Sequence, residues 1–350
     1  MGSQLPLLEA PAGPWTLLDE RARGTRFYRI PARGVLNTPE ATGMPFWSVN
    51  PYIGCEFGCS YCYARDTHRY TLQRAADSGL APPTLPLLPA AESFERNILV
   101  KDRADQLLSR ALVSRNLAGQ SLVIGSATDP YQPAERRFGI TRSLLRCMLP
   151  FSGLGIEIIT KSPLVLRDTA LLGQLAVRNA VRVYVSIATV HRTLARRLEA
   201  RTAIPSARLR ALARLRQAGL DAGVLIAPII PGITDSAHDL ALLLQAARAA
   251  GASFAGGSPL RLGPAARRTF LPHLQREFPE LASRYRRAYA RHDHAPEAYR
   301  EALRRRLARL KAQHGFTSGE HRFLAHESGT AAGAQMELLQ GVASRERCDL

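Results

Sequence analysis

Apolar residues follow two alternating patterns along the chain. Short runs rich in β-branched residues predict buried strands, and longer segments with apolar residues every three or four positions predict amphipathic helices. The six predicted strands are Val49–Ile53, Leu122–Gly125, Ile156–Lys161, Val181–Ile187, Gly223–Ala227 and Ser253–Leu260. Strands that alternate with helices in this way form a parallel sheet, so the sequence predicts an α/β fold, built as a partial barrel or as a doubly wound layer.

The clearest helix is predicted over Asp235–Gly251. Asp235 or Ser236 can cap its first turn, apolar side chains at helical spacing share one face, and Gly251 is a typical stop. Further helices are predicted over Ser206–Gly219 and Thr141–Leu149. In parallel α/β sheets functional groups collect at the carboxyl ends of the strands, so candidate chemistry is expected after each strand.

The pattern changes after Gly263. Residues 264–314 are predicted to be helical and are rich in arginine. Within Pro296–His314 the leucines form a stripe and most arginines lie off it, which indicates a helix that packs through its leucines or, less simply, one that faces a polyanion. The predicted organisation is an N-terminal surface segment (1–45), a partial barrel (46–263), a basic helical extension (264–315) and a loosely ordered tail (316–350).

Composition excludes several classes of protein. Of the 350 residues, 46% are hydrophobic and 22% are charged, which is typical of a globular chain and not of a disordered one. The longest apolar stretch, Ala222–Ile233, contains two prolines and is shorter than the roughly 18–20 residues that cross a bilayer. Met1–Trp15 lacks a basic segment followed by an apolar core, so no signal peptide is predicted. We therefore expect a cytoplasmic protein that does not bind membranes.

The net charge is strongly positive, at +18, with 47 Lys and Arg against 29 Asp and Glu. Only three of the 47 basic residues are lysines. Such a surplus attracts polyanions, of which nucleic acid is the first candidate. A GC-rich coding sequence that uses arginine wherever a positive charge is needed would explain the same composition, and both interpretations stay open.

Three of the five cysteines lie within eight residues of one another. Their spacing, Cys55-x3-Cys59-x2-Cys62, follows the first predicted strand, and five cysteines in a chain of this length do not make a disulfide scaffold. Three thiolates on a short, glycine-containing loop can bind three irons of a cubane [4Fe–4S] cluster. Because a structural site fills every metal position, three ligands would leave one iron open for chemistry.

The cysteine triplet also allows three alternatives to an iron–sulfur cluster. A tetrahedral zinc site could use His68 as its fourth ligand, although zinc sites usually combine two pairs of Cys or His ligands. A redox-active dithiol and coincidental packing are further alternatives. Cys147 lies in a predicted helix, where a free cysteine commonly packs as a small apolar residue. The alternative to an enzyme is a zinc-stabilised basic protein that binds nucleic acid without catalysis.

The cysteine segment and several later strings resemble a known family. The triplet, with an aromatic residue before its last cysteine, is the signature of the radical S-adenosylmethionine (SAM) enzymes. The surrounding sequence resembles the branch related to spore photoproduct lyase, often described as DNA-repair-photolyase-like. The strings that carry the resemblance are Asn50–Arg65, Gly125–Glu135, Thr160–Ser162, Leu198–Arg201 and Ala227–Asp235. They fall within residues 45–262.

The resemblance implies a partial (β/α)6 barrel of the TIM type, with the cysteine loop at its open carboxyl end. It also implies that the fourth iron of a [4Fe–4S] cluster binds the amino and carboxylate groups of SAM. An electron from a donor such as flavodoxin or ferredoxin would cleave SAM to methionine and a 5′-deoxyadenosyl radical, which abstracts hydrogen from a substrate. In such an enzyme the protein binds and orients the reactants and excludes water.

Contacts with the cofactor are implied at the ends of three strands. Ser126, Thr128 and Asp129 would hold the amino group of SAM, since a hydroxyl and a carboxylate suit an ammonium-like partner. Lys161 would pair with the carboxylate as a point charge. Ser186 would bond the ribose hydroxyls. The structural alternatives for these residues are turn formation, a lysine at the barrel rim and an ordinary strand serine.

Further site residues follow from the same resemblance. Arg201 offers a bidentate fork for the carboxylate, unless it forms an exposed ion pair with a glutamate. Tyr61 would cover the cluster or the adenosine. Tyr63 matches a tyrosine that takes part in hydrogen transfer in photoproduct lyases, although an aromatic wall beside the cluster is the plainer role. The loop Ala227–Asp235 packs against adenine in relatives, or is a connection stiffened by prolines.

Two departures limit what the resemblance implies. The hydrogen-donor cysteine of photoproduct lyases has no counterpart in Gly125-Ser126-Ala127, and the usual Glu-Pro-Arg is Glu199-Ala200-Arg201 in this chain. Thymine-dimer repair by the known route is therefore not implied, whereas cleavage of SAM is. We expect a monomeric radical SAM enzyme with lyase-like or other radical chemistry, for which nucleic acid is the leading candidate substrate.

Overall fold

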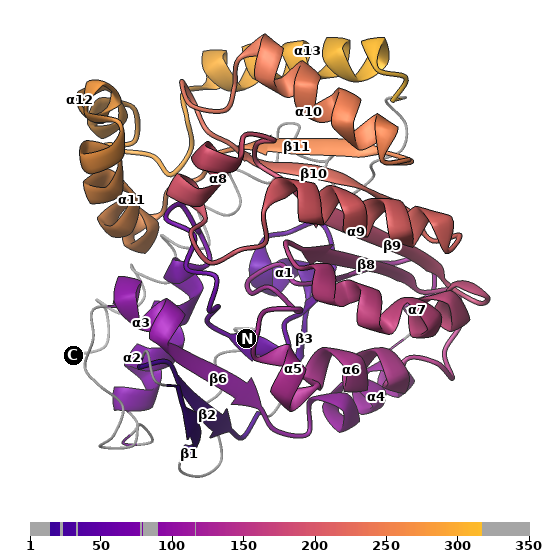
Figure 1. The fold of residues 1–350 in the computed structure, drawn as a ribbon. Helices are drawn as coiled ribbons and strands as arrows, with labels where there is room; N and C mark the ends of the chain where they lie inside the picture. Colours follow the sequence, from indigo (N-terminus) through magenta and orange to yellow (C-terminus); the bar gives the residue numbers. More distant parts are fainter. Residues whose placement is uncertain are drawn as a thin grey trace.

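The computed structural model describes residues 15–21, 24–32, 34–77, 79, 90–115 and 117–316 (Figure 1). The predicted tail beyond Phe316 lies outside the described residues. The strands are β1 (Thr16–Glu20), β2 (Arg26–Ile30), β3 (Leu36–Asn37), β4 (Trp47–Val49), β5 (Tyr52–Ile53), β6 (Asn97–Lys101), β7 (Ser121–Ile124), β8 (Gly155–Thr160), β9 (Ala180–Ser186), β10 (Asp221–Ile229) and β11 (Ala255–Pro259).

The helices include all those that the sequence predicts. They are α1 (Pro39–Thr42), α2 (Arg65–Asp77), α3 (Ala90–Arg96), α4 (Ala104–Ser114), α5 (Glu135–Phe138), α6 (Ile140–Cys147), the 3-10 helix η2 (Pro163–Asp168), α7 (Thr169–Ala176), α8 (Arg192–Leu198), α9 (Pro205–Gln217), α10 (Ala237–Ala249), α11 (Pro264–Glu277), α12 (Pro279–Ala288) and α13 (Glu297–Gln313). In the described ranges, none of these helices has both the length and the apolarity that crossing a membrane requires.

Six parallel strands form the main sheet. The order is β11-β10-β9-β8-β7-β4-β3, and β3 at the edge runs antiparallel to β4. Each of the six parallel strands overlaps a predicted strand. Among the described strands, β3 and β11 end the sheet without pairing with each other, so the barrel is open. The predicted α/β fold is confirmed as a partial (β/α)6 barrel.

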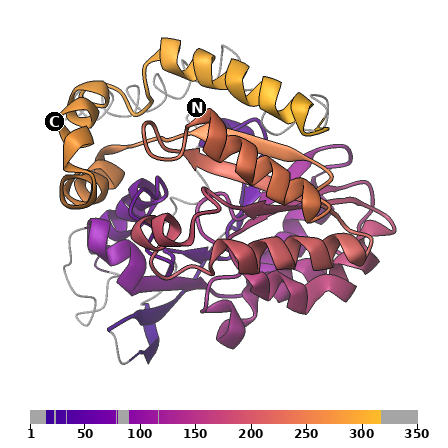
Figure 2. The ribbon, with the colours of Figure 1, turned by 45° about the horizontal axis from the view of Figure 1, so that its top comes forward.

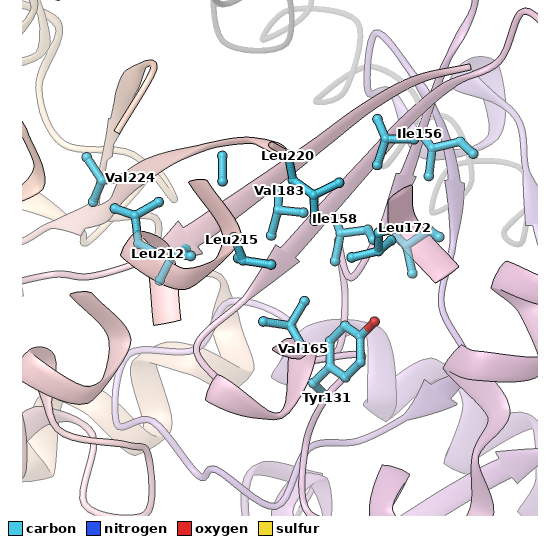
Figure 3. Close-up of a cluster of buried hydrophobic side chains, with 14 of the residues drawn as sticks. Tyr131, Ile156, Ile158, Val165, Leu172, Val183, Leu212, Leu215, Leu220 and Val224 are labelled. Atoms are coloured by element: carbon cyan, nitrogen blue, oxygen red, sulfur yellow. The ribbon is translucent and has the colours of Figure 1, made fainter. Parts of the chain in front are cut away.

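The hydrophobic core lies between the main sheet and its outer helices. Ile156 and Ile158 of β8 belong to this core, which Figure 3 shows in close-up. The other side chains labelled there are Tyr131, Val165, Leu172, Val183, Leu212, Leu215, Leu220 and Val224. Between the two isoleucines, Glu157 accepts hydrogen bonds of 2.6 Å from Ser121 Oγ and from Tyr184 OH. Because successive strand residues point to opposite faces, this polar group lies on the inner side of the barrel.

A second, smaller sheet departs from the sequence prediction. Its order is β1-β2-β6-β5, with β2 and β6 parallel and the other two pairs antiparallel. The sequence predicts a surface segment over residues 1–45, but residues 16–30 contain two strands of this sheet. Phe27 and Tyr28 are fully buried, because they pack into separate apolar clusters. Sequence periodicity missed this sheet because its strands are short and far apart along the chain.

The first predicted strand, Val49–Ile53, is divided between the two sheets. Its first part belongs to β4 of the main sheet, and its last two residues form β5, which pairs with β6. Pro51 lies between the parts, and proline has no backbone N–H to donate to a strand ladder. The chain therefore leaves the main sheet just before the cysteine loop.

Helices α11, α12 and α13 form the predicted basic extension, and α13 lies along α10 (Figures 1 and 2). Leu303, Leu307 and Leu310 of α13 are buried in the main core, whereas Arg304 and Arg305 are exposed. Helix α13 therefore packs against the core through its leucine stripe and exposes its basic face to solvent. This arrangement matches the interpretation of a packing helix.

The extension is tied to the carboxyl end of the barrel. The Asp66 carboxylate in α2 accepts hydrogen bonds from backbone N–H groups at the start of α11, the nearer at 2.7 Å. Tyr285 donates to the carbonyl oxygen of Pro231, and Tyr299 donates to Asp235 Oδ2 over 2.9 Å. These contacts fix the loop after β10, for which the family resemblance implies a place beside the adenine of SAM.

Gly125, at the end of β7, offers a test of how tightly the strand ends pack. Its φ is +99°, and a Cβ at this position would lie 2.6 Å from the Ile159 carbonyl oxygen. We expect Gly125→Ala to lower the free energy of unfolding by more than about 2 kcal/mol, because a backbone clash adds to the left-handed penalty. Gly139 has φ +64° with no atom within 4 Å of an added Cβ, so Gly139→Ala should cost only about 1 kcal/mol.

Denaturant unfolding of the two glycine variants measures both effects. Equal losses in Gly125→Ala and Gly139→Ala would show that close packing at the end of β7 does not matter.

Candidate functional site

The three clustered cysteines lie on the loop that follows β5. Cys55 and Cys59 are buried, Cys62 is half-buried, and all three are free thiols. They pack in one apolar cluster with Phe57. Backbone hydrogen bonds hold the loop, from Cys55 N to the carbonyl oxygen of Phe94 over 2.9 Å and from Cys62 N to that of Cys59 over 3.3 Å. The predicted ligand set is therefore assembled on one ordered loop.

Burial raises the pKa of each of these thiols. For Cys59, burial and then the nearby Glu199 raise the pKa to about 12. The pKa of Cys55 is raised by burial first and further by Asp129, Cys62 and Cys59, so the three sulfurs lie within electrostatic reach of one another. A bound metal cation would have the opposite effect and lower the pKa of each thiol, since metal coordination deprotonates a thiol. The donor set thus fits a metal group that accepts several thiolates.

The geometry does not support the zinc site with His68. Among the described residues, no three side chains of His, Cys, Asp or Glu converge on a position for one metal ion. His68 is fully buried, and its Nε2 lies 2.9 Å from the carbonyl oxygen of Asn97. Burial lowers the pKa of His68 to about 4. A single tetrahedral ion needs ligands that meet within about 2.3 Å of one point, whereas a cubane cluster binds each thiolate at a separate iron.

Thr128 and Gln132 hold the start of the cysteine loop. The Thr128 hydroxyl donates to the carbonyl oxygen of Gly54 over 2.6 Å and accepts from Gln132 Nε2 at 3.0 Å. Gln132 Oε1 accepts from the backbone N–H of Glu56 at 2.9 Å. The family resemblance implies that Thr128 contacts SAM, but its hydroxyl proton is committed to the loop. In the structure Thr128 thus holds the start of the cysteine loop, and its contact with SAM stays a prediction.

Asp129 and Ser126 also link neighbouring strand ends. Asp129 Oδ1 accepts from Thr160 Oγ1 at 2.7 Å, and its Oδ2 accepts from the backbone N–H of Lys161 at 2.7 Å. Burial raises the pKa of Asp129 above its ordinary value. Ser126 Oγ accepts from Asn50 Nδ2 at 3.1 Å. The Asp129 carboxylate, predicted to bind the amino group of SAM, thus connects the ends of β7 and β8. The Ser126 hydroxyl accepts one hydrogen bond and can still donate its own proton.

Lys161 and Ser186 meet at the ends of β8 and β9. Lys161 Nζ donates to Ser186 Oγ over 3.0 Å and lies 5.9 Å from the centre of the Tyr61 ring. Burial acts to lower the pKa of Lys161, but Glu199 and Cys59 outweigh it and raise the pKa above its ordinary value. The amine therefore stays charged, and the structure brings this predicted pair together beside the cysteine loop.

Glu199 is the centre of a buried polar network that the sequence did not predict. Its carboxylate accepts hydrogen bonds from Tyr61 OH and from the Arg208 guanidinium, and it lies 4.0 Å from Lys161 Nζ. Burial acts to raise the pKa of Glu199, but Arg208 and Lys161 overcome it and hold the pKa below its ordinary value. Arg208 also donates to the carbonyl oxygen of Ser186 over 2.9 Å. Arg208 belongs to α9 and is one of its buried residues. The sequence of α9 alone does not indicate that this arginine faces inward.

Arg201 is half-exposed in the structure, and its role as a clamp for the SAM carboxylate stays a prediction. Its guanidinium forms an ion pair with Glu95 and donates to the carbonyl oxygen of Glu56 over 3.1 Å. Its side chain is 48% exposed, which matches the alternative of an exposed Glu–Arg pair. Of the two charged residues in Glu199-Ala200-Arg201, the glutamate faces inward and the arginine outward. The buried positive charge beside Glu199 comes from Arg208.

Tyr63 lies at the surface beside the last cysteine. Its side chain is half-exposed, and its hydroxyl donates to the carbonyl oxygen of Ser126. Tyr61, in contrast, is buried with its hydroxyl on Glu199. Cys147 lies apart in α6, where its Sγ is 3.1 Å from the carbonyl oxygen of Leu144 and packs against the main core. The loop therefore has one covered and one accessible tyrosine.

Comparison with solved structures gives spore photoproduct lyase as a structural neighbour. Its complex with dinucleoside spore photoproduct matches with a TM-score of 0.52 at 16% identity, over 77% of this chain and 74% of that chain. A lyase variant with bound AdoMet and the same dinucleoside matches with a TM-score of 0.50 at 15% identity, over 77% and 76%. Identities this low show a shared fold.

Sequence comparison gives the family. The protein Rv2578c of Mycobacterium tuberculosis is 36% identical over 301 residues, which cover 85% of this chain and 84% of that protein. The protein MJ0683 of Methanocaldococcus jannaschii is 27% identical over 207 residues, which cover 59% and 69%. The model of the radical SAM superfamily matches residues 49–244, which include the cysteine loop and the ends of β7 to β10. This chain therefore belongs to the radical SAM superfamily and is a radical SAM enzyme.

Proposed function

We propose that Cys55, Cys59 and Cys62 bind a [4Fe–4S] cluster at which SAM is reductively cleaved. The observation that carries this proposal is the set of three free thiols, two buried and one half-buried, that pack in one cluster on a loop at the carboxyl end of the barrel. Such a cluster, when bound, would supply one electron to SAM and so yield methionine and a 5′-deoxyadenosyl radical. The chain's own residues bind the cofactor, orient it and exclude water.

The charged and hydroxyl groups beside the loop have separate roles in this proposal. Lys161 is the partner for the SAM carboxylate, because its amine stays charged and Ser186 orients it. Ser126 offers a hydroxyl proton to the polar end of methionine. Ser186 would contact the ribose through its hydroxyl group, which in the structure bonds Lys161 and the carbonyl oxygen of Ala227. Tyr61 covers the loop from the side of Glu199. Tyr63 is a candidate for hydrogen transfer, since it is accessible beside Cys62.

For the substrate we propose nucleic acid. The net charge of +18 favours a polyanion, and the spore photoproduct lyase that matches this fold binds a dinucleoside spore photoproduct. In the Gly125-Ser126-Ala127 segment no thiol is present to donate hydrogen, so we do not propose that this enzyme repairs thymine dimers by the route of that lyase. Binding of DNA or RNA that weakens steeply with salt would support the proposal, and binding that ignores salt would contradict it.

Anaerobic reconstitution tests the proposed chemistry. We expect brown protein with about four irons per chain and formation of 5′-deoxyadenosine that depends on both dithionite and SAM. Zinc in a colourless sample that binds nucleic acid would instead support the alternative of a binding protein without catalysis. A folded, iron-loaded sample that makes no 5′-deoxyadenosine would overturn the proposal.

A substitution of Lys161 tests the proposed contact with the SAM carboxylate. We expect Lys161→Met to raise the KM for SAM by about 10–100-fold while the iron content stays unchanged, because a charge-assisted contact is lost. Lys311→Met, on α13, removes the same charge far from the loop and should leave the KM unchanged. Initial rates of 5′-deoxyadenosine formation over a range of SAM concentrations measure both. An unchanged KM in Lys161→Met would exclude this role for the lysine.

A further inference from the structure

A pocket of about 580 Å³ lies beside the cysteine loop and is lined by four arginines. Arg136 comes from α5, Arg167 from η2, Arg201 from the segment after α8, and Arg214 from α9. None of the residues that line this pocket is an aspartate or a glutamate. Arginine keeps its charge at any physiological pH, so the pocket is a fixed positive concavity built from four separate segments.

Two of these arginines carry charge that nothing in the described chain neutralises. Arg167 forms ion pairs with Glu135 and Asp168, and Arg201 forms one with Glu95. In contrast, Arg136 and Arg214 are exposed and make no ion pair within the part of the chain that the structure describes. The pocket therefore has a surplus of positive charge that is available to an anionic partner.

Phe57 connects this pocket with the cysteine loop. Phe57 lines the pocket and lies between Cys55 and Cys59 in the sequence, and it packs in the same apolar cluster as both. On the same wall, Arg201 donates to the carbonyl oxygen of Glu56 over 3.1 Å. The pocket thus gives an outside partner its approach to the proposed cluster.

Part of the pocket wall comes from the helix side of the sheet. Tyr131 lines it and packs in the core between the sheet and the helices, with Val165 beside it in Figure 3. Lys161 and Ser186, in contrast, meet on the inner side, where Ser186 Oγ donates to the carbonyl oxygen of Ala227 over 3.2 Å. A substrate at the proposed SAM site and a partner in this pocket would therefore approach the cysteine loop from different sides.

We propose that this arginine-lined pocket is the docking site for a small acidic protein that carries one electron to the enzyme. The inference rests on the proposed function, since an electron must reach the cysteine loop from outside. In the step itself the reduced carrier loses one electron and the group held by the three cysteines gains it, and no bond forms or breaks. Charge complementarity steers such encounters, and transient redox complexes need only small interfaces.

Binding of flavodoxin to the iron-free protein tests the docking site without any turnover. We expect the double variant Arg136→Gln/Arg214→Gln to bind flavodoxin at least about tenfold more weakly than the natural protein, with a shallower salt dependence. The matched control Arg284→Gln/Arg287→Gln removes the same charge from exposed positions on α12 and should change the affinity less than about twofold. Isothermal titration calorimetry at two salt concentrations measures both.

Turnover by the reconstituted enzyme supplies a second readout. In the Arg136→Gln/Arg214→Gln variant, formation of 5′-deoxyadenosine driven by reduced flavodoxin should fall, while the rate driven by dithionite should match the natural protein. Unchanged flavodoxin binding in this variant would overturn the proposal, and so would a selective loss of DNA affinity, which would make the pocket a nucleic-acid site. Absence of product with dithionite in the natural protein would instead contradict the proposed function, so the two failures are distinguishable.

Discussion

Replacing Cys55, Cys59 and Cys62 together by alanine is expected to abolish iron binding and all formation of 5′-deoxyadenosine. Each thiolate would hold a different iron, so the protein could not retain the cluster once all three are absent. The fold should survive, because the three side chains are small and lie on a loop outside the main core. Iron analysis and product assay after reconstitution measure the loss.

Cys147→Ala is the matched control for the triple variant. This cysteine is also a free thiol, but it lies in α6 against the main core and is half-buried. The variant should reconstitute with the same iron content and the same rate as the natural protein. A triple variant that keeps its iron, or a Cys147→Ala variant that loses it, would contradict the assignment of the ligands.

Arg208→Met is expected to have the second large effect, a loss of about 3–5 kcal/mol in the free energy of unfolding. The side chains of Arg208 and Glu199 are only 1% and 2% exposed, so removal of the guanidinium leaves a buried carboxylate without its main counter-charge. Arg208 also holds the Ser186 carbonyl at the end of β9. Denaturant unfolding measures the loss, and Arg208→Lys, which keeps a positive charge, should lose less.

A surface ion pair provides the comparison for Arg208→Met. Arg305 lies 3.7 Å from Glu301 on α13, and the two side chains are 72% and 48% exposed. Arg305→Met should therefore change the free energy of unfolding by less than about 0.5 kcal/mol. If Arg208→Met lowers the free energy of unfolding by less than about 1 kcal/mol, the ion pair between Arg208 and Glu199 does not stabilise the fold as proposed.

Much of the fold follows from local periodicity. The six parallel strands and the helices between them are evident because β-branched runs alternate with amphipathic segments, and each element is defined by its own residues. The second sheet was not predicted, because β2 pairs with β6 about seventy residues later, and local patterns carry no information on such a pairing. The division of Val49–Ile53 could have been found, since Pro51 interrupts the strand.

The candidate site was predictable where chemistry depends on spacing along the chain. The triplet Cys55, Cys59 and Cys62 is such a case, and the pair Lys161 and Ser186 follows from the rule that strand ends converge. The orientation of Glu199 and Arg201 could not be predicted, because it depends on which residue of α9 faces the sheet. Burial of Arg208 decides that question, and it depends on packing in three dimensions.

The EPR spectrum of the reduced, reconstituted protein with and without SAM tests the central claim most directly. If three protein thiolates leave one iron open, SAM will shift the signal of the reduced [4Fe–4S] cluster, and SAM labelled with 17O in its carboxylate will broaden it. A spectrum that SAM leaves unchanged, or a cluster whose fourth iron is already bound by a protein side chain, would contradict the claim.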